Sequence, residues 1–155
     1  MIRIATKEDT ANVNNIRKQV NDLHVQGEPE IFKSGFAPEM AEYINEFVNS
    51  NTKYLIINED DNGTINAYAM VEFIVRPENV YRYELKYLEI HEFGVDKTCR
   101  HQGIGTKLIN YIKNFALQKG FNHVELDAWA FNAKAINFYK KMGFEDYRHY
   151  FRLYL

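Results

Sequence analysis

The chain has 155 residues, a formal net charge of −2 and a hydrophobic share of 46%, of which aromatic residues are a large part. This size and composition exclude a disordered chain and are typical of one domain with one core, so a single domain over residues 1–155 is expected. No basic excess exists to neutralise a phosphate backbone, which argues against nucleic acid as a partner.

Cysteine and histidine usage limits the chemistry further. Cys99 is the only cysteine, so no internal disulfide and no Cys-rich metal site is expected. The five histidines show no metal-ligand spacing, and no metal is expected. The first residues lack the apolar run of a signal peptide, and no window approaches the ~20 apolar residues of a membrane span. No membrane partner and a cytoplasmic location are therefore expected.

The first half of the chain predicts a short strand followed by two helices. Ile2–Ala5 has a strand pattern, and Thr6 is expected to cap a helix that runs to about His24. Glycine and proline make residues 25–37 irregular. Pro38 suits the start of a second amphipathic helix, which is expected to end near Asn51.

Three antiparallel strands are expected next. A strand-like pattern begins at Lys53, and a turn follows at Asp60–Gly63. The two partner strands are expected at Thr64–Val75 and Tyr81–Val95. On one face of the strand Tyr81–Val95, apolar side chains are followed by Glu89 and His91, which indicates that this face turns into a cleft. Gly94 is compatible with a β-bulge.

The next stretch, Arg100–Gly105, reads R-H-Q-G-I-G and opens directly into an amphipathic helix. Two glycines at a helix start, where N–H groups are free and the dipole end is positive, favour a phosphate or pyrophosphate. A nucleotide P-loop is excluded because Gly105 is followed by Thr106-Lys107, the reverse of the required order. A dinucleotide fingerprint is weak because Leu108 occupies the position of its third glycine.

The rest of the chain predicts alternating strands and helices. The helix after the glycine loop closes at Lys119-Gly120, and a short strand follows at Val124–Ala128. A helix is expected from Asn132 to about Met142, and Phe144–Leu155 alternates like a final aromatic-rich strand.

Two motifs carry a resemblance to a known family. Arg100, Gly103 and Gly105 fill the pattern R-x-x-G-x-G, and Asn132–Phe144 fills N-x-x-A-x-x-F-Y-x-x-x-G-F. Both are similar to signatures of the GNAT family of N-acetyltransferases, and the order of predicted elements matches over nearly the whole chain. The resemblance implies an α+β fold with a central, mostly antiparallel mixed sheet flanked by helices and splayed between strands 81–95 and 122–128.

The resemblance also implies acetyl-CoA as co-substrate and assigns residues to it. Tyr139 matches the tyrosine whose phenol protonates the leaving thiolate, and Asn132 would hold the pantetheine amides. Main-chain groups near Phe93 and Val95 would bind the pantetheine, and an N–H at or near Val95 would polarise the thioester carbonyl. The diphosphate would lie on the loop and helix start, which comprise Arg100, His101, Gln102, Gly103, Ile104, Gly105 and Thr106.

The base and the acceptor are less defined. Glu89, His91, Glu92 or a water chain are all candidates for taking the proton of the amine, and Glu89 is favoured although an ordinary salt bridge explains each side chain equally well. The expected acceptor is an amine of a small molecule or peptide, which Glu28 and Glu30 would attract unless they are simply solvated. A transferase of longer acyl groups, a non-catalytic acetyl-CoA sensor and a structural protein with an empty cleft are the alternatives. The oligomeric state, monomer or homodimer, is left open.

Overall fold

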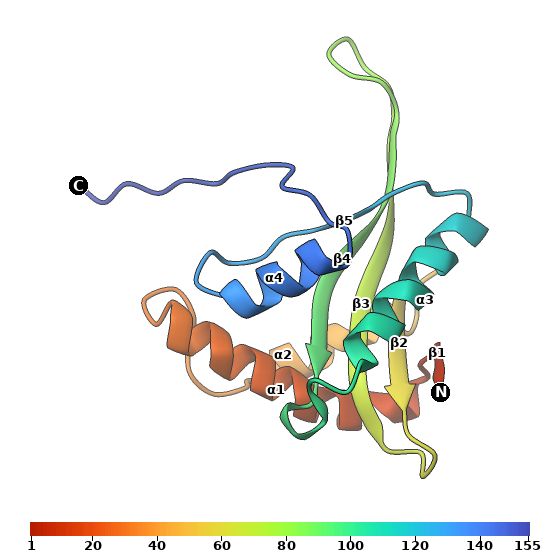
Figure 1. Ribbon diagram of the computed structural model, residues 1–155, viewed down its shortest axis with the longest axis vertical. Coiled ribbons are helices and arrows are strands. Elements are labelled where there is room, and N and C mark those ends of the chain that lie inside the picture. Colours follow the sequence, from red (N-terminus) through yellow and green to blue (C-terminus); the bar gives the residue numbers. More distant parts are fainter.

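The computed structural model describes residues 1–155 and contains a five-stranded sheet with helices on both faces (Figure 1). The strands lie side by side in chain order: β1 (Ile2–Ile4), β2 (Lys53–Glu59), β3 (Ile65–Arg76), β4 (Leu85–Val95) and β5 (Val124–Leu126). All neighbours are antiparallel except β4 and β5, which are parallel. The helices are α1 (Thr10–Gly27), α2 (Pro38–Tyr43), α3 (Ile104–Gln118) and α4 (Ala133–Lys141), with 3-10 turns at Lys7–Asp9, Ile44–Phe47 and Lys97–Cys99. The predicted fold class is confirmed.

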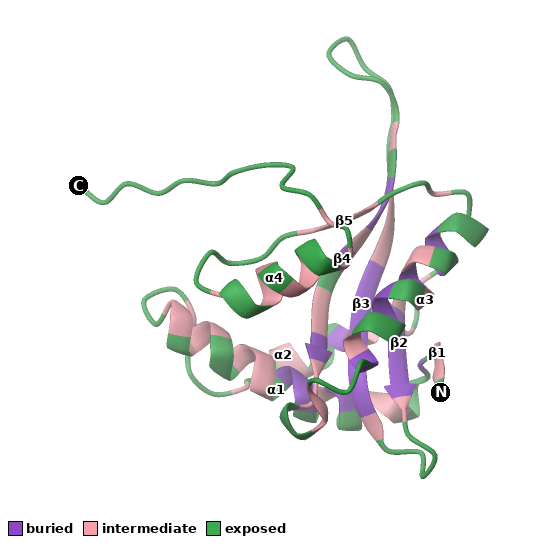
Figure 2. Cartoon of the chain, viewed as in Figure 1, coloured by how far each residue is buried: buried purple, intermediate pink, exposed green.

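Two apolar clusters hold the helices to the sheet, one on each face (Figure 2). On one face, Leu108 and Ile112 of α3 pack with Leu88 of β4. On the other, Val13 of α1 packs with Tyr68 of β3 and with the 3-10 turn after α2. Burying one such aliphatic side chain stabilises the fold by about 1.5–3 kcal/mol, so these clusters account for much of its stability.

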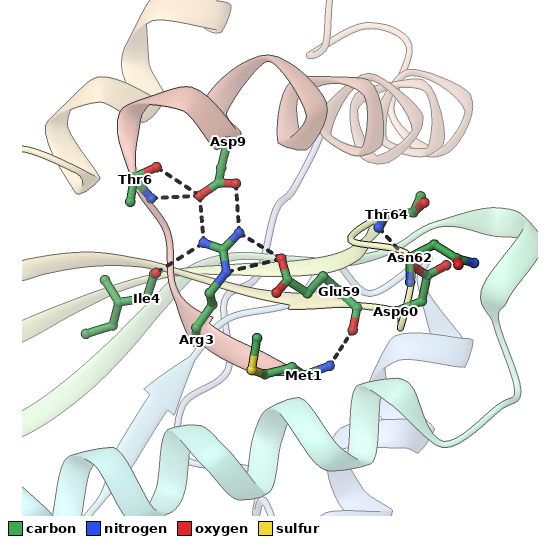
Figure 3. A network of polar contacts seen from close by, with 9 residues as sticks. All are labelled: Met1, Arg3, Ile4, Thr6, Asp9, Glu59, Asp60, Asn62 and Thr64. Atoms are coloured by element: carbon green, nitrogen blue, oxygen red, sulfur yellow. Dashed lines mark hydrogen bonds and ion pairs between the residues drawn. The ribbon is translucent and has the colours of Figure 1, made fainter.

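A polar network fixes the outer strand β1 to its neighbours (Figure 3). The Arg3 guanidinium forms ion pairs with Asp9 at 2.8 Å and with Glu59 at 2.7 Å. The Asp9 carboxylate also accepts a hydrogen bond from the main-chain N–H of Thr6 at 2.8 Å. The hydrogen bonds from Arg3 lower the pKa of Asp9 to about 2. The start of the chain is thus held to both β2 and the turn before α1.

The predicted helix and strand limits differ from the observed ones in several places. The first helix begins as the 3-10 turn and continues to Gly27, beyond the expected end at His24. The second helix tightens into a 3-10 turn at Ile44 and ends before Asn51. β4 begins at Leu85 rather than Tyr81, because residues 77–84 form an exposed hairpin tip that projects beyond the sheet (Figure 1). β5 ends at Leu126, where its pairing with β4 stops, and not at Ala128.

The β-bulge lies at His91 and not at Gly94. Met70 pairs with Glu92 and Val71 with Ile90, which leaves His91 as the extra residue of β4. Gly94 is paired regularly with Tyr68, and a Cβ at this glycine would lie 2.5 Å from the Tyr68 ring. Gly94 is therefore explained by close packing, and the bulge changes which β4 side chains face α1.

The final strand predicted for Phe144–Leu155 is wrong. Residues 145–155 are exposed, form no main-chain hydrogen bond within the chain and lead away from the body of the molecule as an extended tail (Figures 1 and 2). Alternation of side chains specifies two faces of a strand, but a strand also needs a neighbouring edge, which this segment does not reach within its own chain.

Candidate active site

β4 and β5 separate to leave an open strand edge. The two strands pair only from Leu88–Val124 to Ile90–Leu126, and β4 continues to Val95 without a neighbour on that side. The N–H of Asp96 donates to the carbonyl of Asn66 in β3. Because main-chain groups alternate in an antiparallel pair, those of Phe93 and Val95 point to the open side. The predicted splay between these strands is thus present.

The loop that follows β4 presents free main-chain donors. No main-chain N–H from Arg100 to Thr106 donates a hydrogen bond within the chain. The Arg100 side chain turns back, and its Nε donates to the Val95 carbonyl at 3.1 Å, which ties the loop to the end of β4. Free N–H groups at the positive end of a 15-residue helix bind anions, so the residues present fit a diphosphate.

The two glycines of this loop have different structural roles. Gly103 has a φ of +77°, and nothing lies within 4 Å of the position of a Cβ, so its role is conformational. His101 shares this left-handed region with a φ of 63°. Gly105 is helical, and a Cβ there would lie 3.2 Å from the Phe138 ring. Gly105 therefore allows α3 and α4 to approach closely, a role that the sequence pattern did not indicate.

The second motif forms α4 and the residue before it. Asn132 caps the helix, and its Oδ1 accepts a hydrogen bond from the N–H of Ala135 at 3.2 Å. Its side-chain amide NH₂ forms no hydrogen bond within the chain and is left for a ligand. Tyr139 lies on the helix among aromatic rings, 6.2 Å from Phe93 and 5.7 Å from Phe144 between ring centroids. The contact with Phe93 places Tyr139 beside the open part of β4.

Burial controls the chemistry of Tyr139. The phenol oxygen accepts and donates no hydrogen bond within the chain, yet it is not closed off from solvent. Burial, assisted by the nearby negative charge of Asp127, raises the pKa of Tyr139 to about 12. The phenol therefore holds its proton at neutral pH and can act as a donor.

Because of the bulge, the three base candidates Glu89, His91 and Glu92 all lie on the face of the sheet that α1 and α2 cover. His91 Nε2 lies 2.8 Å from an oxygen of Glu72 and 3.9 Å from one of Glu89. The His91 ring also contacts Phe47 edge to face, with centroids 5.4 Å apart. His91 thus has the geometry of an imidazole oriented by a carboxylate, which leaves Nδ1 available.

Glu92 is engaged differently. It accepts two hydrogen bonds from Arg17, both at 2.8 Å, and one from the Tyr68 hydroxyl at 3.0 Å. Arg17 is almost completely buried, and with Tyr43 of α2 it lines a pocket beside Glu92. Sequence reasoning missed Arg17 and Tyr68. Arg17 was detectable, because it stands four residues after Val13 on the apolar stripe of α1.

A row of carboxylates crosses the same face. Glu72 of β3 lies directly opposite Glu89 of β4, and Glu89 lies opposite Glu125 of β5. Like charges in directly opposed positions destabilise a sheet, and only His91 and His123 lie among them as partners. Such an arrangement attracts cations. Sequence reasoning could not find Glu72 and Glu125, because they meet Glu89 only through strand register.

Aromatic rings close the region between the end of α1 and the loop after β5. His24 stacks on Phe32 at 4.9 Å, and Phe32 meets Trp129 edge to face at 5.2 Å. Burial lowers the pKa of His24, so the ring is neutral at neutral pH. Glu28 is bound to Arg152 of the tail by hydrogen bonds of 3.1–3.3 Å, while Glu30 is exposed.

Solved structures share this arrangement. The chain superimposes on a mutant of the BH1408 protein from Bacillus halodurans with a TM-score of 0.96 and 26% identity, over 100% of this chain and 99% of that one. It superimposes on AAC(6')-Iy, in complex with a bisubstrate analogue of CoA, with a TM-score of 0.75 and 18% identity, over 100% and 97% of the two chains. The second likeness shows the fold alone. The two likenesses together show that the fold is that of acyltransferases of known structure.

Sequence comparison gives the family. The model of the Acetyltransferase (GNAT) family matches residues 17–144, and the chain belongs to this family. It is 48% identical over 58 residues to the uncharacterized N-acetyltransferase MJ1207 of Methanocaldococcus jannaschii, which is 37% of this chain and 26% of that protein. It is 45% identical over 91 residues to the thialysine N-epsilon-acetyltransferase of Mus musculus, 57% of this chain and 49% of that protein. The matches thus span half or less of these relatives.

Two further observations concern metals and membranes. No three His, Cys, Asp or Glu side chains come together as a group that could hold a metal ion. None of the helices combines the length and the apolar character that crossing a bilayer requires.

Proposed function

We propose that the protein transfers the acetyl group of acetyl-CoA to a primary amine of a small molecule or peptide, as one domain and in a cytoplasmic setting. The observation that carries this proposal is the run of free N–H groups from Arg100 to Thr106, at the positive end of α3 and beside the open edge of β4. Membership of the GNAT family supports acetyl-CoA as the donor.

In this proposal the coenzyme lies along the loop and the splay. The main chain of the loop, including Gln102, Gly103, Ile104, Gly105 and Thr106, binds the diphosphate, assisted by the side chains of Arg100 and His101. Main-chain groups of Phe93 and Val95 bind the pantetheine as an added strand would, because they point to the open side. The free amide NH₂ of Asn132 is the further donor available to it.

The reaction forms a C–N bond and breaks a C–S bond, while the amine loses one proton and the sulfur gains one. A main-chain N–H at or near Val95 would polarise the thioester carbonyl, and one such donor typically accounts for ~10²–10³ in rate. Tyr139 would donate its phenol proton to the leaving sulfur. This fits a phenol whose pKa of about 12 keeps it protonated at neutral pH.

The strand pattern favours Glu89 as the base, whereas the hydrogen bond between His91 and Glu72 favours His91. We propose that His91 takes the proton of the amine and that the carboxylates of Glu72 and Glu89 stabilise the resulting imidazolium. Glu92 is the weaker candidate, because Arg17 and Tyr68 already bind its oxygens.

The acceptor is proposed to be cationic. Glu72, Glu89 and Glu125 form a negative row that a polyamine or aminoglycoside would neutralise. We propose this row as the acceptor site in place of Glu28, because Glu28 is already paired with Arg152. The names of the thialysine acetyltransferase and of the aminoglycoside N-acetyltransferase AAC(6')-Iy, a structural neighbour, also describe enzymes of small amines.

The test measures thiol release from acetyl-CoA with a panel of polyamines, aminoglycosides, amino acids and peptides, together with calorimetry of CoA binding. Turnover with one class of amine supports the proposal. Tight CoA binding without acetylation of any amine would instead favour the sensor, and faster turnover of longer acyl-CoA donors would favour a different acyltransferase. Absence of CoA binding would leave a structural protein.

A further inference from the structure

Four aromatic rings close one end of the candidate site, and their position bears on which amines can enter. They are the rings of His24, Phe32, Trp129 and Phe131, here called the aromatic clasp. On the basis of the acetyl transfer proposed above, we propose that the clasp shuts one end of the acceptor site. The acceptor amine then enters from one side only, as a small free amine does, and a lysine inside a peptide chain is excluded.

The rings of the clasp form a closed cycle of contacts. His24 stacks on Phe32 with ring centroids 4.9 Å apart, and Phe32 meets Trp129 edge to face at 5.2 Å. Trp129 stacks on Phe131 at 6.5 Å, and Phe131 meets His24 edge to face at 6.2 Å. All four separations lie in the range of favourable aromatic pairs, so each ring is held by two others.

The clasp joins parts of the chain that lie on either side of β4. His24 belongs to α1, which packs on one face of the sheet, and Phe32 follows α1 in the chain. Trp129 and Phe131 lie between β5 and α4, and α4 packs on the opposite face. β4 contacts α1 on one face and α4 on the other (Figure 1). The clasp therefore bridges the two faces beside the open edge of β4.

Gly27 provides the seat of the clasp on α1. A Cβ at this glycine would lie 2.3 Å from the ring of Phe131, so any side chain here must displace the ring. Gly27 is the last residue of the helix and has an ordinary helical conformation, which does not itself require glycine. The absence of a side chain at Gly27 is thus explained by the close approach of Phe131.

The clasp is separate from both cores of the molecule. None of its rings belongs to the apolar cluster under α3 or to the cluster on the opposite face. Trp129 and Phe131 remain 36% exposed. Changes in the clasp should therefore leave the fold intact, and its contribution can be measured at the site alone.

The acceptor site stays open on another side. A cavity of about 400 Å³ lies beside Glu92 and is lined by Met40 and Tyr43 of α2. A small amine can enter there, on the face that carries the acidic row. A lysine inside a peptide needs room for main chain in both directions, and the clasp blocks one of them. The N-terminus of a peptide has chain in one direction only and is not excluded.

The test compares the best small amine of the panel with a peptide that is blocked at both ends and carries one internal lysine. Wild-type protein should favour the small amine by at least about tenfold in kcat/KM. Gly27→Ala should displace Phe131 and reduce this preference by raising kcat/KM for the peptide, and Phe131→Ala should do the same. Gln26→Ala, at an exposed position of the same helix end, is the control and should keep the wild-type preference.

Trp129 gives a readout that does not depend on catalysis, because it is the only tryptophan of the chain. Gly27→Ala and Phe131→Ala should make its fluorescence more accessible to quenching by acrylamide, whereas Gln26→Ala should not. Equal use of the peptide and the small amine by wild-type protein would overturn the role of the clasp and leave acetyl transfer in place. An unchanged preference in both clasp variants would overturn it as well. Absence of acetylation of any amine would instead remove the proposed function, and the role of the clasp with it.

Discussion

Residues 1–116 and residues 117–155 are built in different ways. Every buried residue lies between Ala5 and Ala116, and none lies beyond, although the second region is rich in Phe and Tyr (Figure 2). The first region closes a core on each face of its sheet. The second region carries Tyr139 and arranges β5, α4 and the tail around open surface. The second region thus depends on what it binds, and coenzyme A is the proposed contact that it lacks.

The largest effect should come from the second region, at Tyr139. Tyr139→Phe removes the proposed donor to the leaving sulfur and should lower kcat by about 10²–10⁴-fold. The free energy of unfolding should stay unchanged, because the phenol oxygen has no hydrogen-bond partner within the chain. Steady-state kinetics with acetyl-CoA measures this, and Tyr147→Phe on the exposed tail is the control. A full rate at every pH would remove Tyr139 from the mechanism.

Stability should separate the two regions directly. Leu108→Ala leaves a cavity in the cluster under α3 and should lower the free energy of unfolding by about 2–5 kcal/mol. Leu126→Ala, the same change in half-buried β5, should cost only about 1 kcal/mol. Urea unfolding of both variants gives the two values. Equal costs would break the comparison between the regions.

The glycine loop offers a matched pair. Gly103 and Gly120 have φ values of +77° and +79°, and nothing lies within 4 Å of a Cβ at either. Gly103→Val and Gly120→Val should therefore strain the chain equally, by about 1–3 kcal/mol. Only Gly103→Val should weaken CoA binding, at least about tenfold in Kd by calorimetry. The same Kd for both variants would show that the loop does not bind the diphosphate.

The smallest effect concerns acid stability of the first region. Because the pKa of Asp9 is lowered from 3.8 to about 2 in the folded state, its contribution is present above pH 4 and is lost as the pH falls toward 2. Asp9→Asn should cost about 1–2 kcal/mol at neutral pH and only a small fraction of that near pH 2, where the carboxyl is half protonated in the folded state. Urea unfolding as a function of pH measures the difference. A constant difference from pH 7 to pH 2 would mean that the ion pair with Arg3 contributes no stability.

Local patterns in the sequence predicted the helices around the candidate site better than the sheet beside it. The R-H-Q-G-I-G loop and the motif around Tyr139 depend on neighbours along the chain, so their helices were foreseeable, whereas the open splay was expected only from the resemblance to the family. The bulge at His91 and the approach of Glu72 to Glu89 depend on strand register, which no local pattern contains. The tail failed as a predicted strand because alternation defines faces and not the partner edge.

The central claim is that main-chain donors from His101 to Thr106 hold the diphosphate of coenzyme A. Nitrogen-15-labelled protein titrated with CoA, and separately with pantetheine, tests it most directly, since pantetheine lacks the diphosphate. We expect the amide signals of residues 101–106 to shift with CoA and not with pantetheine. Signals that stay in place with CoA, or that shift equally with both ligands, would contradict the claim.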